Sequence, residues 1–250
     1  MTNPVHAAER RPLETSASTK GATRGLGALL IADALLSFAP VVILGAAIGW
    51  PASLDKPAAE QLAAIHANAG MVTLGYGVYL LYSILVAPVM IGLAAKVFGG
   101  LQHPVAATVA AFGALSALAR AIGILRWLTG SVSLAEAHAA PGLSAEGRAA
   151  VETMQAAVNA WGGAIGEMLG VAAFASIWAI AASLVILRDR RLPAWAGLTG
   201  LLAGVLLALP ALELFGIAPP VSIVISTTGI QLWFLALGLL LLWRALRRPA

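Results

Sequence analysis

Residues 104–129 read PVAATVAAFGALSALARAIGILRWLT, and this stretch decides the fold. It is apolar and long enough for a helix to cross a bilayer. It also contains Arg120 and Arg126, and an arginine at the centre of a membrane helix costs about 2.5–3.5 kcal/mol on insertion scales. Such a side chain needs a partner inside a bundle or a route to the interface. The stretch therefore predicts a membrane-spanning helix with an internal polar position.

The helical positions of the two arginines predict opposite environments. Arg120 shares a face with small residues, which let a neighbouring helix approach closely. Arg126 shares its face with larger apolar residues and precedes Trp127, so we expect its side chain to extend along lipid to the headgroups. The small face consists of Gly113, Ser116 and Gly123, and the larger face of Leu115, Ala119 and Ile122. Arg120 is thus predicted inside a bundle and Arg126 outside it.

The composition of the whole chain is that of a membrane protein. Of its 250 residues, 60% are hydrophobic and 10% are charged, with a mean hydropathy of +0.90. Soluble domains carry about 25% charged residues. The net charge of +4 comes from short clusters between apolar runs, so it does not indicate a nucleic-acid partner. The absence of cysteine excludes disulfides, thiolate catalysis and cysteine-ligated metals.

Six apolar runs predict an all-α, polytopic six-helix bundle embedded in membrane lipid. The predicted spans are residues 25–49, 70–95, 104–128, 159–187, 194–218 and 222–243. The polar residues 1–24 are predicted to be a disordered cytoplasmic tail and residues 245–250 a basic cytoplasmic tail. After the first span, Leu54, Ala58, Leu62 and Ile65 recur at helical spacing. This spacing predicts a short amphipathic helix on the outer membrane surface.

The basic residues predict the orientation of the bundle. If the N-terminus is cytoplasmic, eleven basic residues fall in cytoplasmic segments and two, Lys56 and Arg148, in outer ones. Cytoplasmic loops are enriched in Lys and Arg, so both termini are predicted to lie inside the cell. The eleven are Arg10, Arg11, Lys20, Arg24, Lys96, Arg188, Arg190, Arg191, Arg244, Arg247 and Arg248.

The fourth span contains a face for close helix packing. Gly162, Gly166 and Gly170 recur at every fourth residue, a spacing typical of tightly packed membrane helices. Because Gly166 is central, we expect Gly166→Leu to impair folding more than Gly238→Leu. Glu167 lies beside this face and is the first predicted partner of Arg120, with Glu213 as the alternative partner.

Depths along the helices predict a polar pocket that faces outward. At 1.5 Å per residue, Arg120 lies roughly 24 Å from the cytoplasmic end of its span, and Glu167 roughly 29–30 Å. The predicted ligand-binding residues in this outer third are Arg120, Tyr76, Tyr79, Glu167 and Glu213. The predicted inner polar contact, or floor of the pocket, consists of Asp33 and Gln231.

Three functions remain open for such a pocket. We favour binding or passage of an amphiphilic or anionic small molecule or lipid, with Arg120 as the anion anchor, because the charges concentrate at the outer end. The second is an intramembrane isomerase or cyclase for a lipophilic substrate, with Glu167 or Glu213 as general acid. The third is a structural or sensor subunit. No histidine spacing or nucleotide motif predicts a metal or other cofactor, and the oligomeric state stays open.

Several of these features resemble a bacterial family. They are the Gly-rich first span, the arginine of span three, the glutamate of span four and the segment RRLPAWAGLTGLLAG. The basic-Leu-Pro-x-Trp turn is present as Arg190, Arg191, Leu192, Pro193 and Trp195. Over about residues 22–245 the chain is similar to the bacterial integral membrane family of unknown function DUF 4386. The resemblance implies a six-helix bundle, located in the bacterial inner membrane, and implies no reaction.

Overall fold

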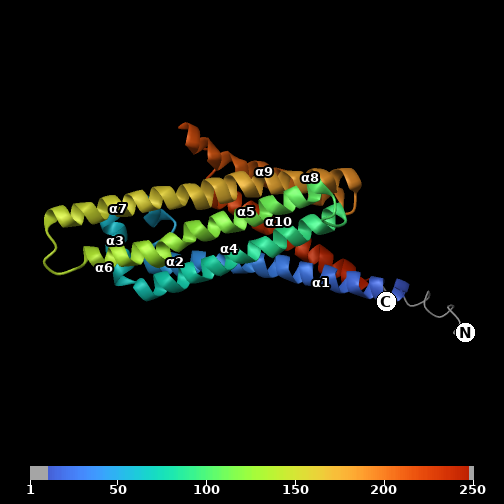
Figure 1. Cartoon of the computed structure of the whole chain (residues 1–250), viewed down its shortest axis with the longest axis horizontal. Helices are drawn as coiled ribbons and strands as arrows, with labels where there is room; N and C mark the ends of the chain where they lie inside the picture. Colours follow the sequence, from blue (N-terminus) through green and yellow to red (C-terminus); the bar gives the residue numbers. More distant parts are fainter. Residues whose placement is uncertain (1–10, 248–250) are drawn as a thin grey trace, which may run out of the picture.

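The computed structural model describes residues 11–247, and every regular element in that part of the chain is helical (Figure 1). Six helical runs within it are long and apolar enough to cross a membrane. In chain order they are Lys20–Ile48, Ala69–Phe98, Pro104–His138, Ala145–Asp189, Ala194–Phe215 and Ile223–Arg247. The predicted all-α fold with six spans is confirmed.

The first span is broken in its middle. It consists of α1 (Arg11–Leu36) and α2 (Phe38–Ile48), which meet at Ser37. Pro40 has no amide hydrogen, so it cannot donate the helical bond to the residue four positions earlier. The amide of Ser37 still donates to the carbonyl of Asp33 at 3.0 Å, which keeps the two helices nearly continuous.

The other elements follow in order along the chain. They are α3 (Ala58–Ala67), α4 (Ala69–Phe98), α5 (Pro104–Arg126), α6 (Val132–His138), α7 (Ala145–Gly163), α8 (Ser176–Asp189), α9 (Ala194–Ala208) and α10 (Ile223–Arg247). Two π-helical segments interrupt these runs: η3 (Trp127–Ser131) follows α5, and η4 (Ala164–Ala175) joins α7 to α8. A 3₁₀ segment, η5 (Leu209–Phe215), ends the fifth span. Wider π turns are rare and occur frequently at functional sites.

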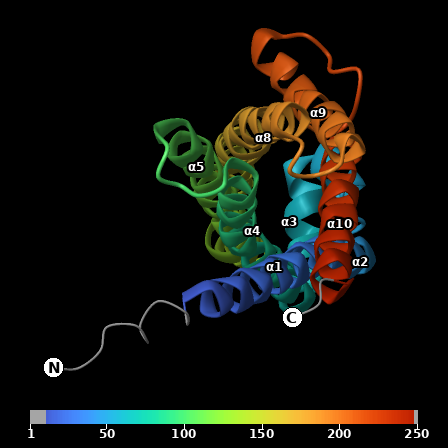
Figure 2. The same ribbon diagram turned by 90° about the vertical axis from the view of Figure 1, so that its right-hand side faces the viewer.

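The spans pack as a ring in the order α1, α10, α9, α8, α5, α4 (Figure 2). Glycines allow the closest approaches between neighbours. A Cβ atom added at Gly238 of α10 would lie 2.8 Å from the carbonyl oxygen of Gly27 in α1, and one at Gly123 of α5 would lie 2.7 Å from the Cα of Gly166. The first and last spans therefore close the ring through backbone contact.

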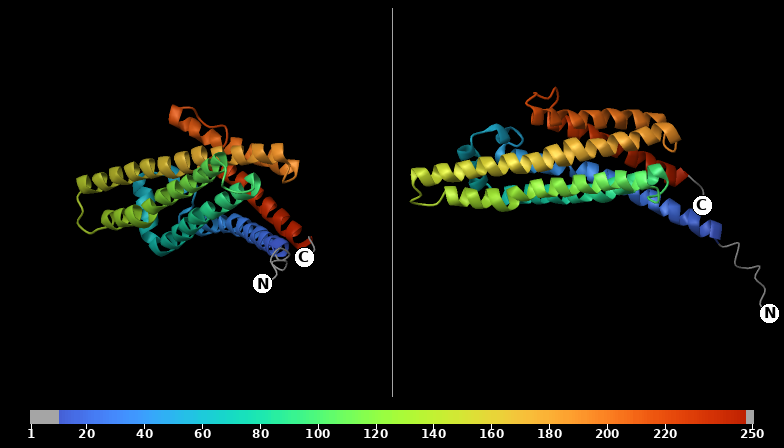
Figure 3. Two further views of the ribbon diagram at one scale, coloured as in Figure 1. Left: turned by 45° about the vertical axis from the view of Figure 1, so that its right-hand side comes forward. Right: turned by 45° about the horizontal axis from the view of Figure 1, so that its top comes forward.

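Two of the helical runs are longer than a membrane is thick. The run Pro104–His138 has 35 residues and the run Ala145–Asp189 has 45, which is about 50 Å and about 65 Å against a hydrocarbon core of about 30 Å. Their excess length, α6 and α7, forms one end of the molecule (Figure 3).

The short helix α3 packs against α6 and α7 at this end. Its residues Gln61, Leu62 and Ile65 are buried there. The amphipathic spacing after the first span thus marks a real helix, but its apolar face is covered by protein. The location of this helix at the outer membrane surface stays a prediction.

The opposite end of the molecule carries the start of α1 and the end of α10 (Figure 1). Helix α1 begins at Arg11 and α10 continues to Arg247, where the sequence predicts a disordered tail over residues 1–24 and a basic tail over residues 245–250. Residues 1–10 and 248–250 lie outside the described part. Contacts at this end include the hydrogen bond of Lys96 Nζ to Thr23 Oγ1, at 2.9 Å.

Two hydrophobic clusters fill the ring. One contains Trp178 and Trp233, whose indole nitrogens donate to the carbonyls of Met90 (3.1 Å) and Ala196 (2.8 Å). The other lies nearer α3 and includes Leu44, Tyr76 and Trp127, among others. Tyr79 packs against both clusters, so the polar residues around Tyr79 lie between two apolar layers.

Candidate ligand site

Four aromatic rings form a row inside the bundle, and three of them come from α4. The rings of Tyr76 and Trp127 stack with centroids 4.7 Å apart, Tyr76 stacks on Tyr79 at 6.5 Å, and Tyr79 meets Tyr82 at 5.8 Å. A spacing of three residues places the tyrosines on one helix face. The ring of Trp50 stands edge-on to Tyr79 at 6.2 Å.

An arginine lies over each end of this aromatic row. The guanidinium carbon of Arg126 is 5.3 Å from the centre of the Trp127 ring, and that of Arg120 is 4.7 Å from the centre of the Tyr82 ring. Cations over aromatic faces are attracted by the ring quadrupole, more strongly when water is excluded. The row therefore holds two positive charges at fixed positions.

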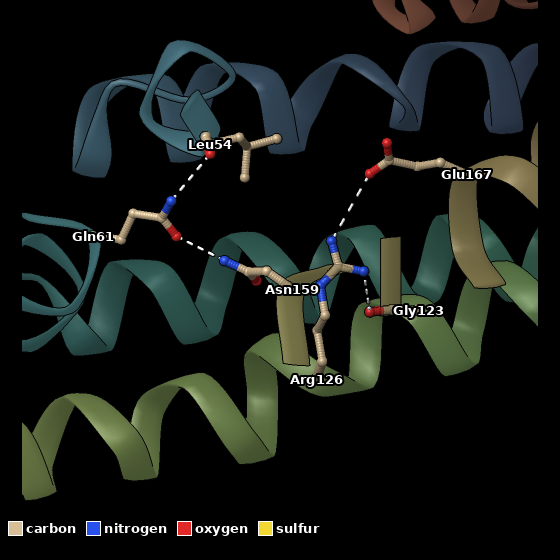
Figure 4. Close-up of polar contacts among 6 residues, drawn as sticks. All are labelled: Leu54, Gln61, Gly123, Arg126, Asn159 and Glu167. Carbon is tan, nitrogen blue, oxygen red and sulfur yellow. Dashed lines mark hydrogen bonds and ion pairs between the residues drawn. The ribbon is translucent and has the colours of Figure 1, made fainter. Parts of the chain in front are cut away.

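Arg126 is an internal residue that pairs with Glu167 (Figure 4). Its Nη2 atom lies 3.8 Å from Glu167 Oε1, its Nη1 donates to the carbonyl of Gly123 at 3.1 Å, and its side chain is only 10% exposed. The prediction that Arg126 extends outward along lipid is wrong. The side chain folds back across Gly162, where a Cβ atom would lie 2.4 Å from Arg126 Cδ.

Arg120 lies inside the bundle as predicted, but its partner is Tyr82. Arg120 Nη2 donates a short hydrogen bond to the hydroxyl of Tyr82, and Gln231 Nε2 donates to the same hydroxyl at 2.5 Å. The predicted pairing of Arg120 with Glu167 is therefore wrong, since Arg126 occupies that position. Gly170 of η4 makes room for Arg120, because a Cβ atom there would lie 2.8 Å from Arg120 Cγ.

Asp33 of α1 is fully buried close to this network. Neither carboxylate oxygen has a hydrogen-bond partner within residues 11–247, and the charge of Arg120 is within electrostatic range. Counted from residue 25 at 1.5 Å per residue, the sequence predicts Asp33 about 12 Å lower than Arg120. The apolar helical run of the first span begins earlier, at Lys20.

Two cavities meet at this network. The first, called here the charged cavity, has a volume of about 420 Å³ including its mouth and is lined by Tyr76, Tyr79, Arg120, Arg126, Trp127 and Glu167, among others. The second, called the lateral cavity, has about 490 Å³ and is lined by Phe38, Val41, Tyr82, Thr228 and Gln231, among others. Trp50, Tyr79 and Arg120 line both.

A polar chain fixes the roof of the charged cavity (Figure 4). Gln61 Nε2 donates to the carbonyls of Leu54 (3.0 Å) and Lys56 (2.7 Å), and Asn159 Nδ2 donates to Gln61 Oε1 at 2.7 Å. These bonds tie the turn after α2 to α3 and α7. Since Leu54 lines the charged cavity, the turn covers the cavity from the α3 side.

The predicted site residues divide into three groups. Tyr76, Tyr79, Arg120 and Glu167 are together in the charged cavity. Gln231 lines the lateral cavity and donates to the same Tyr82 hydroxyl as Arg120. Asp33 is within electrostatic range of Arg120 but lines neither cavity. Glu213 is exposed at the end of η5 and lines neither cavity.

Sequence reasoning missed Tyr82, Arg126, Trp50 and Trp127 as site residues. The three-residue tyrosine spacing was a usable signal for Tyr82. The sequence pattern favours a membrane-interface position for Trp127, because tryptophan is enriched there. Within the described residues, no group of three or more His, Cys, Asp or Glu side chains could hold a metal ion.

Comparison with protein families places the chain. The domain of unknown function DUF4386 matches residues 26–245, so the chain belongs to this family. The family resemblance predicted from the Arg190–Trp195 turn and its neighbouring spans is confirmed. Comparisons with curated proteins and with solved structures found no match.

Proposed function

We propose that this member of the DUF4386 family binds an anionic amphiphile in the charged cavity, with Arg120 and Arg126 holding the anion. The observation that carries the proposal is a set of donors on residues that line this cavity. Arg126 Nε and the hydroxyl of Tyr76 are buried and have no hydrogen-bond partner within the described residues. Buried donors without partners are costly, and an anionic group would satisfy them.

The charge of the cavity also favours an anion. Its lining contains two guanidinium groups and one carboxylate, that of Glu167. Charge-assisted hydrogen bonds to arginine are shorter and stronger than neutral ones, and arginine binds carboxylates and phosphates with two parallel bonds. The aromatic row supplies apolar walls next to these donors, which suits a ligand with one polar and one apolar end.

The orientation predicted from the basic residues places this cavity on the outer side of the membrane. Ligand would then be bound from the outer leaflet or the outer solution. The favoured role is binding rather than full translocation, because the charged side chains gather at one level of the bundle.

The proposal is tested with dodecyl phosphate as the probe, by calorimetry on the purified protein in a neutral detergent. We expect saturable binding that weakens about tenfold or more in Arg120→Gln and in Arg126→Gln, since a hydrogen bond to a charged group contributes about 1.5–3 kcal/mol. The matched control is Arg148→Gln, at an exposed position of α7, and it should keep full affinity. Equal heats for all four proteins would mean partition into detergent only and would overturn the proposal.

A second candidate function uses the same cavity. Glu167 lines it, and its side chain is 37% exposed, so a lipophilic substrate could reach the carboxylate of an intramembrane isomerase or cyclase. The test is whether the protein converts a bound lipid chemically. Loss of this conversion in Glu167→Gln, with binding of dodecyl phosphate retained, would favour an enzyme over a binding protein.

A further inference from the structure

The lateral cavity differs in character from the charged cavity that it joins. Its walls come from α2, through Phe38 and Val41, and from α10, through Thr228. Phe38 is 41% exposed and Val41 is 40% exposed, so this wall reaches the outer surface of the bundle. The cavity thus runs from Arg120 inside the ring to a face covered with exposed apolar side chains.

The polar groups of its outer wall are already satisfied. The hydroxyls of Thr227 and Thr228 donate to carbonyls of their own helix, each at 2.8 Å. These hydroxyls therefore already have partners within α10. Only the inner end is polar, where Gln231, which is 3% exposed, has a carbonyl oxygen without a hydrogen-bond partner in the described part of the chain.

The shape of this opening follows from the helix crossing described above. Helices α1 and α10 are in backbone contact at Gly27 and Gly238. Beyond the break at Ser37 the chain continues as α2, which packs against α4. The lateral cavity lies between α2 and α10 at this level.

We propose that the lateral cavity holds the hydrocarbon chain of the amphiphile whose anionic head occupies the charged cavity, so that the ligand is a single-chain anionic lipid that enters from the bilayer between α2 and α10. The inference rests on the proposed function of Arg120 and Arg126. Arg120, Tyr79 and Trp50 line both cavities, so a head bound at Arg120 lies beside the chain site. The apolar wall and its exposed rim match a hydrocarbon chain continuous with lipid.

The test uses the cysteine-free chain as a background for single fluorescent labels. A bimane label on Thr228→Cys or on Val41→Cys reports the two walls of the lateral cavity. The matched controls are labels on Ile225→Cys and Val42→Cys. The wild-type residues at these positions are 59% and 70% exposed and do not line the cavity. The probe is stearate with a nitroxide quencher at carbon 12, added to protein in neutral detergent.

At Thr228 and Val41 we expect saturable loss of fluorescence that excess dodecyl phosphate reverses and that Arg120→Gln abolishes. At Ile225 and Val42 we expect only quenching that rises linearly with the concentration of the probe and that dodecyl phosphate does not reverse. If dodecyl phosphate binds through Arg120 but quenching at both cavity positions matches the controls, the chain lies elsewhere and the inference is overturned. If no binding depends on Arg120, the proposed function fails, and the inference with it.

Discussion

Arg126 and Arg120 show what a helical projection can and cannot predict. A projection gives the direction in which Cβ leaves the helix, and for Arg120 that direction was sufficient because the residue is 7% exposed inside the ring. A long side chain can bend back from its starting direction. Arg126 does so because Gly162 and Gly163 of α7 leave room beside α5. The room for the Arg126 side chain is provided by glycines of another helix. The sequence of residues 104–129 alone carries no information about them.

The two residues of the Arg126–Glu167 ion pair are predicted to affect stability unequally when they are replaced. Glu167→Leu should destabilise the protein more than Arg126→Leu, because the first leaves a guanidinium that is 10% exposed and the second a carboxylate that is 37% exposed. The double variant should recover part of the loss, with a coupling of about 0.5–3 kcal/mol in thermal unfolding in detergent. Because Glu167 is partly solvated, we expect the lower half of that range.

The control is a double-mutant cycle with Arg120→Leu and Glu167→Leu. In this cycle the losses of stability of the two single variants should add. Coupling in the Arg120 cycle and additivity in the Arg126 cycle would contradict the pairing described here.

At the scale of the elements, the glycine contacts rank the helix interfaces. The sequence predicts that Gly166 tolerates substitution less than Gly238, since it is central to three regularly spaced glycines. The distances favour the reverse order. The nearest atom to a Cβ at Gly166 is the Cα of Gly123 at 3.2 Å, whereas a Cβ at Gly238 would meet Ile31 Cγ1 at 2.7 Å and Gly27 O at 2.8 Å. Spacing of glycines shows a packing face but not how close its partner comes.

We therefore expect Gly238→Ala to lower stability by about 1–3 kcal/mol, because the methyl group overlaps backbone atoms of α1. Gly229→Ala lies on the same helix, and its added Cβ would meet no atom within 4 Å. That variant should be neutral or stabilising by up to about 1 kcal/mol, as alanine favours the helix. Thermal unfolding in detergent measures both. Equal melting temperatures for the two variants would show that α1 and α10 are not in close contact.

For the whole molecule, the number and type of spans could be predicted because the bilayer leaves little choice. A lipid-exposed chain must satisfy its backbone hydrogen bonds internally, so each apolar run becomes a helix. The site could be predicted only in part. Helices such as Pro104–His138 continue beyond the membrane, so residue counts from a span boundary do not give depth reliably. Which helices are neighbours, and hence that Gln231 meets Tyr82, depends on packing that single spans do not encode.

The orientation can be tested on the intact cell with single cysteines. The exposed positions Ala139, at the α6–α7 end, and Asp189, at the opposite end, report the two sides. With both termini inside the cell, Ala139→Cys should react with a membrane-impermeant thiol reagent and Asp189→Cys should react only after lysis. The reversed labelling pattern would place the charged cavity on the cytoplasmic side. Ser53, although at the same end as Ala139, is only 5% exposed and unsuitable as a reporter.

The contact of Gly27 with Gly238 also sets a time scale for assembly. About 200 residues separate the two glycines, and at about 5–20 residues per second a ribosome needs about 10–40 s to synthesise them. Throughout that interval the α1 surface around Gly27 and Asp33 lacks α10. Helix α4 also packs on α1, and it is complete much earlier. The second span therefore covers part of the α1 surface before the last helix arrives and the ring closes.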